Sequence, residues 1–308
     1  MKSAKRGDFY AAFPFPAGRA YAGRMILVTG ATGKVGTELV EQLVASGQPV
    51  RALVRDPEKA SRSLPAAVEL SRGDLADAES IEEALSGVEK MFLLAPVDQR
   101  MLEMEQHATA AAKAAGVKHL VKLSAIGADP NSPRFFLSVH GKSEQTIRDA
   151  GVPFTFLRPN FFMQNLLTSA ATIKQQGAIY QPAADSAASF IDAADIAAVA
   201  AKVLTSAGHE GKAYTLTGPQ SLTYTQVAEL LSRVIAKPVK YIDVPRDAAK
   251  QGMMQSGMPE WLAEGICQLV DAAREGEMAG VSPDVRNILG QPGIKLEEFL
   301  RENRGAFV

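Results

Sequence analysis

The sequence contains little cysteine, almost no net charge and no long apolar run. Cys267 is the only cysteine in 308 residues, which excludes an intramolecular disulfide and a multi-cysteine metal site. The 33 basic and 34 acidic residues give a formal net charge of −1, so charge offers no reason to expect nucleic acid or an anionic membrane as a partner. No apolar run approaches the length of a membrane span, and the four histidines form no HExxH-type ligand pair. We therefore expect no metal and a reducing, cytoplasmic setting.

Residues 1–24 differ from the rest of the chain. They carry five basic residues against one acid and lack the continuous apolar core of a secretory signal. The first strand is predicted only from Met25, which would itself make a natural start. We expect residues 1–24 to be a loosely ordered leader, and the alternative is an organelle import sequence.

The stretch 25–36, MILVTGATGKVG, predicts a strand, a tight turn and the start of a helix. Gly30 suits the turn, Gly33 lets a pyrophosphate approach the main chain, and Gly36 lets the helix pack close to the strand. The free N–H groups and the positive end of the helix dipole would face an anion. The turn therefore predicts a dinucleotide site, whose contacts we expect at Gly30, Thr32, Gly33, Lys34, Val35 and Gly36.

The second predicted strand, 49–54, ends at Arg55. An acidic residue near this position holds the ribose of NAD, whereas an arginine can pair with the 2′-phosphate of NADP. Lys59 would add a second positive charge, although Asp56 could serve a ribose instead. We therefore expect NADP(H), with NAD(H) the less favoured cofactor. The alternative is that Arg55 and Lys59 sit on a solvated helix start.

Strands alternate with helices through the first half, which predicts an α/β fold with a doubly wound parallel sheet of the Rossmann type. We expect an NADP-binding domain over 25–170, with later segments returning to it, and a smaller substrate-binding α/β lobe over 171–308. Strand ends face the cofactor in such sheets, so Asp74 and Leu75 are candidates for the adenine and Ala95 and Pro96 for the middle of the dinucleotide. Asp74 is equally compatible with a cap or turn.

The region after the fifth predicted strand, 118–124, offers the candidates for chemistry. Ser124 ends that strand and is expected to line the nicotinamide site. A loop, 125–139, and a helix, 140–150, follow. His140 and Glu144 lie four residues apart on one helical face, so His140 could donate a proton or hold the ribose while Glu144 orients it. A helical salt bridge or a buried histidine is the structural alternative.

The sixth predicted strand, 152–157, leads into the segment RPNFFMQN at 158–165. Pro159, Asn160 and Phe161 are candidates for cofactor contact. Aromatic faces suit a flat acceptor, so Phe162, Asn165 and Phe136 on the preceding loop are candidates for substrate contact. A place in the core is an equally good interpretation of the phenylalanines.

Together, these stretches resemble the NmrA-like atypical short-chain dehydrogenase/reductases. The resemblance is carried by TGATGKVG at 29–36, RDPEK at 55–59, GDL at 73–75, His140-x-x-x-Glu144 and RPNFFM-x-N at 158–165, and it covers roughly 25–307. Within these, the chain is most similar to NADPH-dependent quinone oxidoreductases and triphenylmethane reductases. The resemblance implies NADPH held by the glycine turn and Arg55, with reduction of conjugated, electron-poor acceptors.

No tyrosine lies four residues before a lysine, although that pair is the usual proton-transfer device of short-chain reductases. A quinone or a cationic dye can accept a hydride into a delocalised system and take its proton from water. We therefore expect an NADPH-dependent oxidoreductase for a small conjugated or aromatic acceptor, acting as a monomer or homodimer. The alternative is a nucleotide-sensing regulator without turnover, which the same family also contains.

Overall fold

The computed structural model describes residues 25–308, so the predicted leader lies outside the described residues. Two compact units are formed. The first contains residues 25–124, Val139–Leu157 and Ile196–Tyr214, and the second contains Ala125–Ser138, Arg158–Asp195 and Thr215–Val308. The chain crosses between the units several times, so the division is more interleaved than a single boundary near residue 170.

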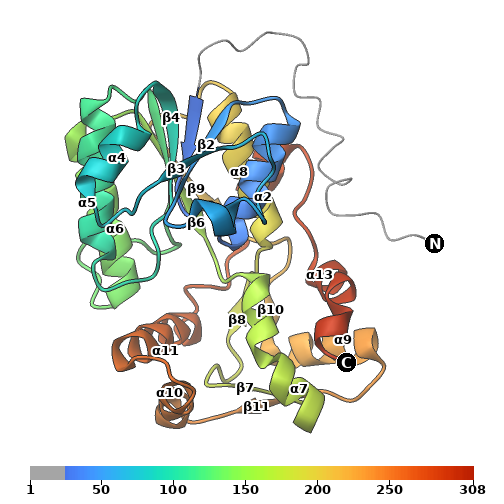
Figure 1. Cartoon of the computed structure of the whole chain (residues 1–308). Helices are drawn as coiled ribbons and strands as arrows, with labels where there is room; N and C mark the ends of the chain where they lie inside the picture. The colour runs from blue at the N-terminus through green and yellow to red at the C-terminus, as the bar shows by residue number, and fades with distance from the viewer. Residues whose placement is uncertain (1–24) are drawn as a thin grey trace. The chain divides into compact units, whose positions relative to one another are not determined.

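The main sheet has seven strands, and its first strand lies in the first unit. The strand order is β3-β2-β1-β4-β5-β6-β9 (Figure 1). Its registered pairs β1–β2, β1–β4, β2–β3, β4–β5 and β5–β6 all run parallel. The strands are β1 (Met25–Val28), β2 (Val50–Val54), β3 (Glu69–Arg72), β4 (Val88–Leu93), β5 (His119–Leu123), β6 (Phe154–Pro159) and β9 (Lys212–Leu216). This is the predicted Rossmann-type sheet.

Helices cover both faces of this sheet. Figure 1 shows α2 and α8 on one face and α4, α5 and α6 on the other. Their bounds are α2 (Lys34–Ala45), α4 (Ala78–Ala84), α5 (Met101–Ala114), α6 (Phe135–Ala150) and α8 (Ala193–Thr205), and the short α3 (Pro57–Ala60) follows β2. Because both faces are covered, the central strands are largely buried, and β1 is apolar along its whole length, as buried parallel strands generally are.

Packing explains these helices. Val35, Leu39 and Leu43 recur at helical spacing in α2 and are buried against the sheet. Helix α8 is buried almost all round, because its alanines let it approach its neighbours closely. The all-buried strand β5 is an exception to apolar packing, since it carries His119 and Lys122 inside the protein.

The strand order puts the topological switch point beside β1. Strand β1 has β2 on one side and β4 on the other, and the three run parallel, so their carboxyl ends meet at one edge. Ligands of doubly wound sheets bind at that edge. The Thr29 hydroxyl ties two of these ends together, because it accepts a hydrogen bond from the Leu94 N–H at 2.8 Å.

The second unit contains two small sheets and a set of helices. Strands β8 (Ala187–Ala188) and β10 (Leu222–Thr223) pair antiparallel, and β7 (Ala178–Gln181) and β11 (Lys240–Asp243) pair parallel. The helical elements are η1 (Met163–Ser169), α7 (Ala170–Gln176), α9 (Tyr224–Ile235), α10 (Arg246–Gln255), α11 (Glu260–Arg274), α12 (Asp284–Leu289), α13 (Leu296–Glu302) and η2 (Arg304–Ala306). A capping box of Thr223 and Gln226 opens α9.

One local prediction is wrong. Phe135 and Phe136 were expected on a loop, but they form the first turn of α6, which begins five residues before its predicted start. The Phe135 N–H is accepted by Gln268 Oε1 at 2.8 Å, and the Ser138 N–H by the Arg134 carbonyl at 2.9 Å. The helix start depends on a partner 133 residues away in the chain, which local pattern cannot reveal. Helix α12 and strands β8 and β10 were not predicted either.

Candidate active site

The turn after β1 is built around glycine. Gly30 has φ +63°, a conformation that favours glycine, and a Cβ there would lie 2.9 Å from a side-chain carbon of Leu94. A Cβ on Gly36 would lie 2.1 Å from the Gly30 carbonyl oxygen, closer than real Cβ atoms come. The absent side chains therefore let α2 start directly against the turn, as a dinucleotide site requires.

The N-terminus of α2 has no side-chain cap. Gly33, in extended conformation, is the N-cap residue, and no side chain accepts a hydrogen bond from the first turn. The neighbouring helices differ, because Asp56 caps α3 and Asp77 caps α4. The first-turn N–H groups of α2 have no intrahelical partner, and Thr32, Gly33 and Lys34 are exposed around them. This terminus offers an anion both donors and the positive end of the helix dipole.

The end of β2 adds positive charge. Arg55 and Lys59 are exposed, and within residues 25–308 neither side chain makes an ion pair or a hydrogen bond. The neighbouring Asp56 uses Oδ1 to accept the Lys59 N–H at 3.0 Å. Two cations are thus available for a phosphate, while the carboxylate that could serve a ribose already caps α3.

The ends of β3 and β4 present mainly backbone. Asp74 is a turn residue, since its Oδ1 accepts the Ala76 N–H at 3.0 Å. The Leu75 and Ala95 side chains are buried, and Pro96 is exposed. Their contacts with a dinucleotide remain predictions, and Leu75 has little side-chain surface to offer an adenine.

Two polar clusters lie beside the end of β5. In the first, the Ser124 hydroxyl donates to Glu144 Oε1 at 2.7 Å, and Arg148 Nη2 donates to Glu144 Oε2 at 3.2 Å. In the second, the Lys122 ammonium donates to Glu105 Oε1 at 2.7 Å and lies 3.3 Å from His140 Nδ1. Both side chains of the Lys122–Glu105 pair are buried, at 0% and 1% exposure.

His140 is therefore next to a cation. Partial burial of the His140 side chain, together with the positive charge of Lys122, holds the pKa of His140 well below its ordinary value. The imidazole is neutral at physiological pH and is a weak acid. The contacts of Glu144 described above are with Ser124 and Arg148, so the expected orientation of His140 by Glu144 stays a prediction, while Lys122 is the residue seen at the ring.

Sequence analysis missed Lys122 and Glu105. A signal was present, because Lys122 interrupts an apolar strand and Glu105 lies at helical spacing from Met101, Met104 and Ala108, the buried face of α5. Opposite charges at two buried positions indicate an internal ion pair.

Several candidate residues of the second unit are buried, and their polar groups already have partners in the protein. Asn160 is buried: its amide nitrogen donates to Ser189 Oγ at 2.8 Å and to the Met278 carbonyl at 2.7 Å, and its Oδ1 accepts the Phe161 N–H at 2.7 Å. Phe136 is buried, and its ring fills the space beside Gly265, where a Cβ would lie 2.6 Å away. Pro159 is buried, Phe161 and Phe162 are half-buried and Asn165 is exposed.

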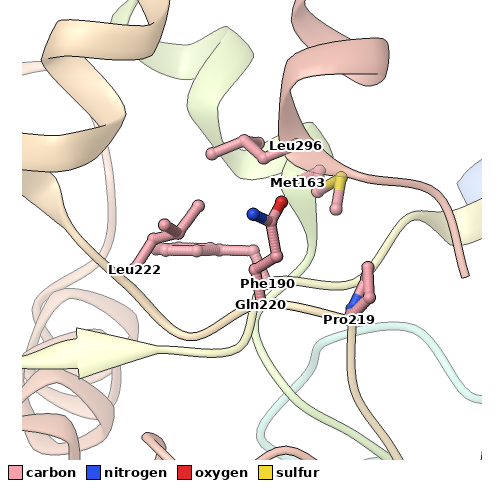
Figure 2. A pocket seen from close by; sticks show the side chains of 6 residues that line it. All are labelled: Met163, Phe190, Pro219, Gln220, Leu222 and Leu296. Carbon is pink, nitrogen blue, oxygen red and sulfur yellow. The ribbon is translucent and has the colours of Figure 1, made fainter.

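Figure 2 shows an apolar depression in the second unit, lined by Met163, Phe190, Pro219, Gln220, Leu222 and Leu296. It leaves no room for a water molecule. None of the predicted substrate residues lines it, so it is a packing gap and gives no information on the acceptor. The described residues hold no cluster of three or more metal-ligating side chains, and no helix among them could cross a membrane.

A family model, described as the NmrA-like family, matches residues 23–297. The chain belongs to the NmrA-like family. It is 41% identical over 283 residues to an NAD(P)H azoreductase from Xenophilus azovorans, covering 92% of this chain and 99% of that one. Among solved structures, it resembles the NADPH complex of an NADPH-dependent quinone oxidoreductase from Escherichia coli (TM-score 0.83, 31% identity, 90% and 99% coverage). It also resembles the NADP(H) complex of the Citrobacter sp. triphenylmethane reductase (TM-score 0.81, 31% identity, 90% and 99% coverage).

Proposed function

We propose that this chain uses NADPH to reduce a small conjugated acceptor, such as an azo compound, a quinone or a cationic dye, by direct hydride transfer. The observation that carries the proposal is the uncapped, glycine-lined start of α2, together with Arg55 and Lys59, two cations that have no partner within residues 25–308. The similarity to the azoreductase, the quinone oxidoreductase and the triphenylmethane reductase supports an NAD(P)H-dependent reductase.

The residues of the turn fit a dinucleotide. The main-chain N–H groups at 32–36 would hold the pyrophosphate, and Gly33 leaves room for its approach. Arg55 and Lys59 would pair with the 2′-phosphate, which NADPH has and NADH lacks. When bound, the cofactor supplies the hydride.

The second part of the proposal concerns the proton. The neutral His140 is a poor acid, and the sequence has no Tyr-x-x-x-Lys pair, so a simple ketone would lack the proton donor it needs. A quinone or an azo compound can take the hydride first, spread the resulting negative charge and receive one proton from solvent, whereas a cationic dye is neutralised by the hydride and needs no proton. The role of the protein is then to bind and orient the two reactants and to exclude water.

The test is NADPH oxidation, followed by its absorbance, with azo dyes, quinones, triphenylmethane dyes and simple ketones as acceptors and NADH as the paired control. We expect turnover with at least one conjugated class, none with ketones, and a preference for NADPH. Tight NADPH binding without oxidation by any acceptor would contradict the proposal and favour the nucleotide-sensing alternative.

A further inference from the structure

The buried cation beside His140 is unusual, because lysine is almost never fully buried unless it is paired. Lys122 has 0% side-chain exposure and lies on β5, between α5, which supplies Glu105, and α6, which supplies His140. Such a charge needs a compensating structural or functional gain, since removing it from water is costly.

The hydrogen bonds of Lys122 are complete. An ammonium group has three N–H donors and no acceptor. Lys122 Nζ has three acceptors within reach: Glu105 Oε1 at 2.7 Å, the Leu123 carbonyl at 3.3 Å and His140 Nδ1 at 3.3 Å. The imidazole nitrogen is therefore one of three matched partners of a charged lysine.

This match decides the tautomer of His140. Because Lys122 can only donate, Nδ1 must be the acceptor, and the ring proton is then on Nε2. Within residues 25–308, Nε2 makes no hydrogen bond, and His140 is only half-buried. The ring thus keeps one unused N–H donor.

We propose that Lys122 is a positioning residue that fixes His140 as the neutral Nε2–H tautomer, so that His140 serves the reaction as a hydrogen-bond donor and not as a proton donor. The catalytic role of His140 rests on the proposed function, whereas the geometry of the Lys122–His140 contact does not. The Nε2–H would stabilise negative charge on the acceptor as the hydride arrives, and no proton would leave the ring. Glu105, on α5, supports the arrangement by accepting a hydrogen bond from the Lys122 ammonium.

The charged groups around His140 are consistent with this role. On β5 there is Lys122, on α5 there is Glu105, paired with Lys122, and on α6 there are Glu144 and Arg148, paired with each other. The positive charge in contact with the ring is Lys122, which opposes protonation of the imidazole.

The test uses nitrogen NMR of the full-length protein labelled in its histidines, with the His140 signals assigned by His140→Gln. Lys122→Met alone would leave Glu105 as an unpaired buried carboxylate and risks misfolding. The informative variant is therefore the double Lys122→Met/Glu105→Leu, which removes both charges and replaces them with apolar groups. Arg148→Gln is the matched control, because it removes a cation from α6 without touching the Lys122 contact.

In the parent protein and in Arg148→Gln, we expect His140 to stay neutral, with Nε2 protonated, at the pH where an ordinary histidine is half protonated. In the double variant, we expect a mixture of tautomers and a titration that begins at higher pH. Identical His140 spectra in all three proteins would overturn the inference, and so would a protonated Nδ1 in the parent protein.

A second measurement separates this inference from the proposed function. With a quinone acceptor, the double variant should lose about tenfold or more in kcat while KM for NADPH stays unchanged, as expected when a donor that acts in the transition state is lost. The NMR result is independent of turnover, so a protein that oxidises no NADPH could still confirm the tautomer. Conversely, if the parent protein is a reductase and the double variant has an unchanged kcat, the role of Lys122 is contradicted and the proposed function is not.

Discussion

The residues predicted for the site differ between the two units in how far the protein itself satisfies their hydrogen bonds and buries them. At the sheet edge of the first unit, the helix N-terminus of α2 and the side chains of Arg55 and Lys59 keep their hydrogen-bonding capacity unused within the described residues. In the second unit, Asn160 is buried with every partner supplied by the protein, and Phe136 is buried against Gly265. The comparison teaches that unused capacity at strand ends indicates a ligand site, whereas satisfied and buried groups indicate structure.

The largest effect should come from Gly36→Ala. The new Cβ would lie 2.1 Å from the Gly30 oxygen and 2.7 Å from Ala31 Cα, so α2 must move away from the turn. A displacement of this size should weaken NADPH binding about a hundredfold and destabilise the protein by roughly 1–3 kcal/mol. Calorimetric titration and thermal unfolding measure both effects.

Gly252→Ala is the matched control for this prediction. No atom lies within 4 Å of a Cβ at that position in α10, so the change should stabilise the helix slightly and leave NADPH binding as it was. Equal binding by the Gly36→Ala and Gly252→Ala proteins would show that the turn does not hold the cofactor.

His119 is a buried polar residue of the first unit, with 1% of its surface exposed. Burial, with a further contribution from Lys90, lowers the pKa of His119 to about 4. The unfolded chain therefore binds a proton that the native protein does not, and stability is lost as the pH falls from about 6.5 towards 4. The loss from this group is about 3 kcal/mol.

His119→Gln should remove that part of the acid sensitivity, which denaturant unfolding at a series of pH values would show as a flatter profile. The difference between the two proteins is the readout, since other groups also titrate in this range. Parallel profiles would mean that His119 is not the group responsible.

Asn160→Ala should cost about 2–3 kcal/mol of unfolding free energy, because it leaves the Phe161 N–H without its acceptor and removes the amide donor that Ser189 Oγ and the Met278 carbonyl share. If Asn160 acts only in the structure, the folded variant should bind NADPH as tightly as the parent. A clear loss of NADPH affinity in the folded variant would restore the prediction that Asn160 contacts the cofactor, and it would break the contrast between the units.

Arg55→Ala should show the opposite pattern. The side chain is exposed and makes no bond within the described chain, so the melting temperature should hardly change. NADPH affinity should fall about tenfold, corresponding to the loss of one charge-assisted contact of about 1.4 kcal/mol, while NADH affinity stays the same. Lys59→Ala is the companion variant, with a smaller effect of the same kind. An unchanged preference for NADPH over NADH in both variants would refute the assignment of the 2′-phosphate.

The predicted fold depended on patterns that local interactions determine. The strand, the tight turn and the helix start predicted over 25–36 involve residues close in sequence, and each is found as β1, the glycine turn and the start of α2. Boundaries were less certain where a distant partner decides them, as the contact of Phe135 with Gln268 shows.

By itself, the sequence determined the doubly wound α/β fold, the glycine turn and the positive charges that follow β2, because a strand, a turn and a helix start are encoded within about a dozen adjacent residues. Only the tertiary structure decided that Lys122 meets His140 and Glu105, and that Asn160 is enclosed by Ser189 and Met278. These contacts join residues from 17 to 118 positions apart. The chain encodes them through packing of whole elements: local patterns indicate that Lys122 and Glu105 are buried charges, but not that Lys122 meets His140.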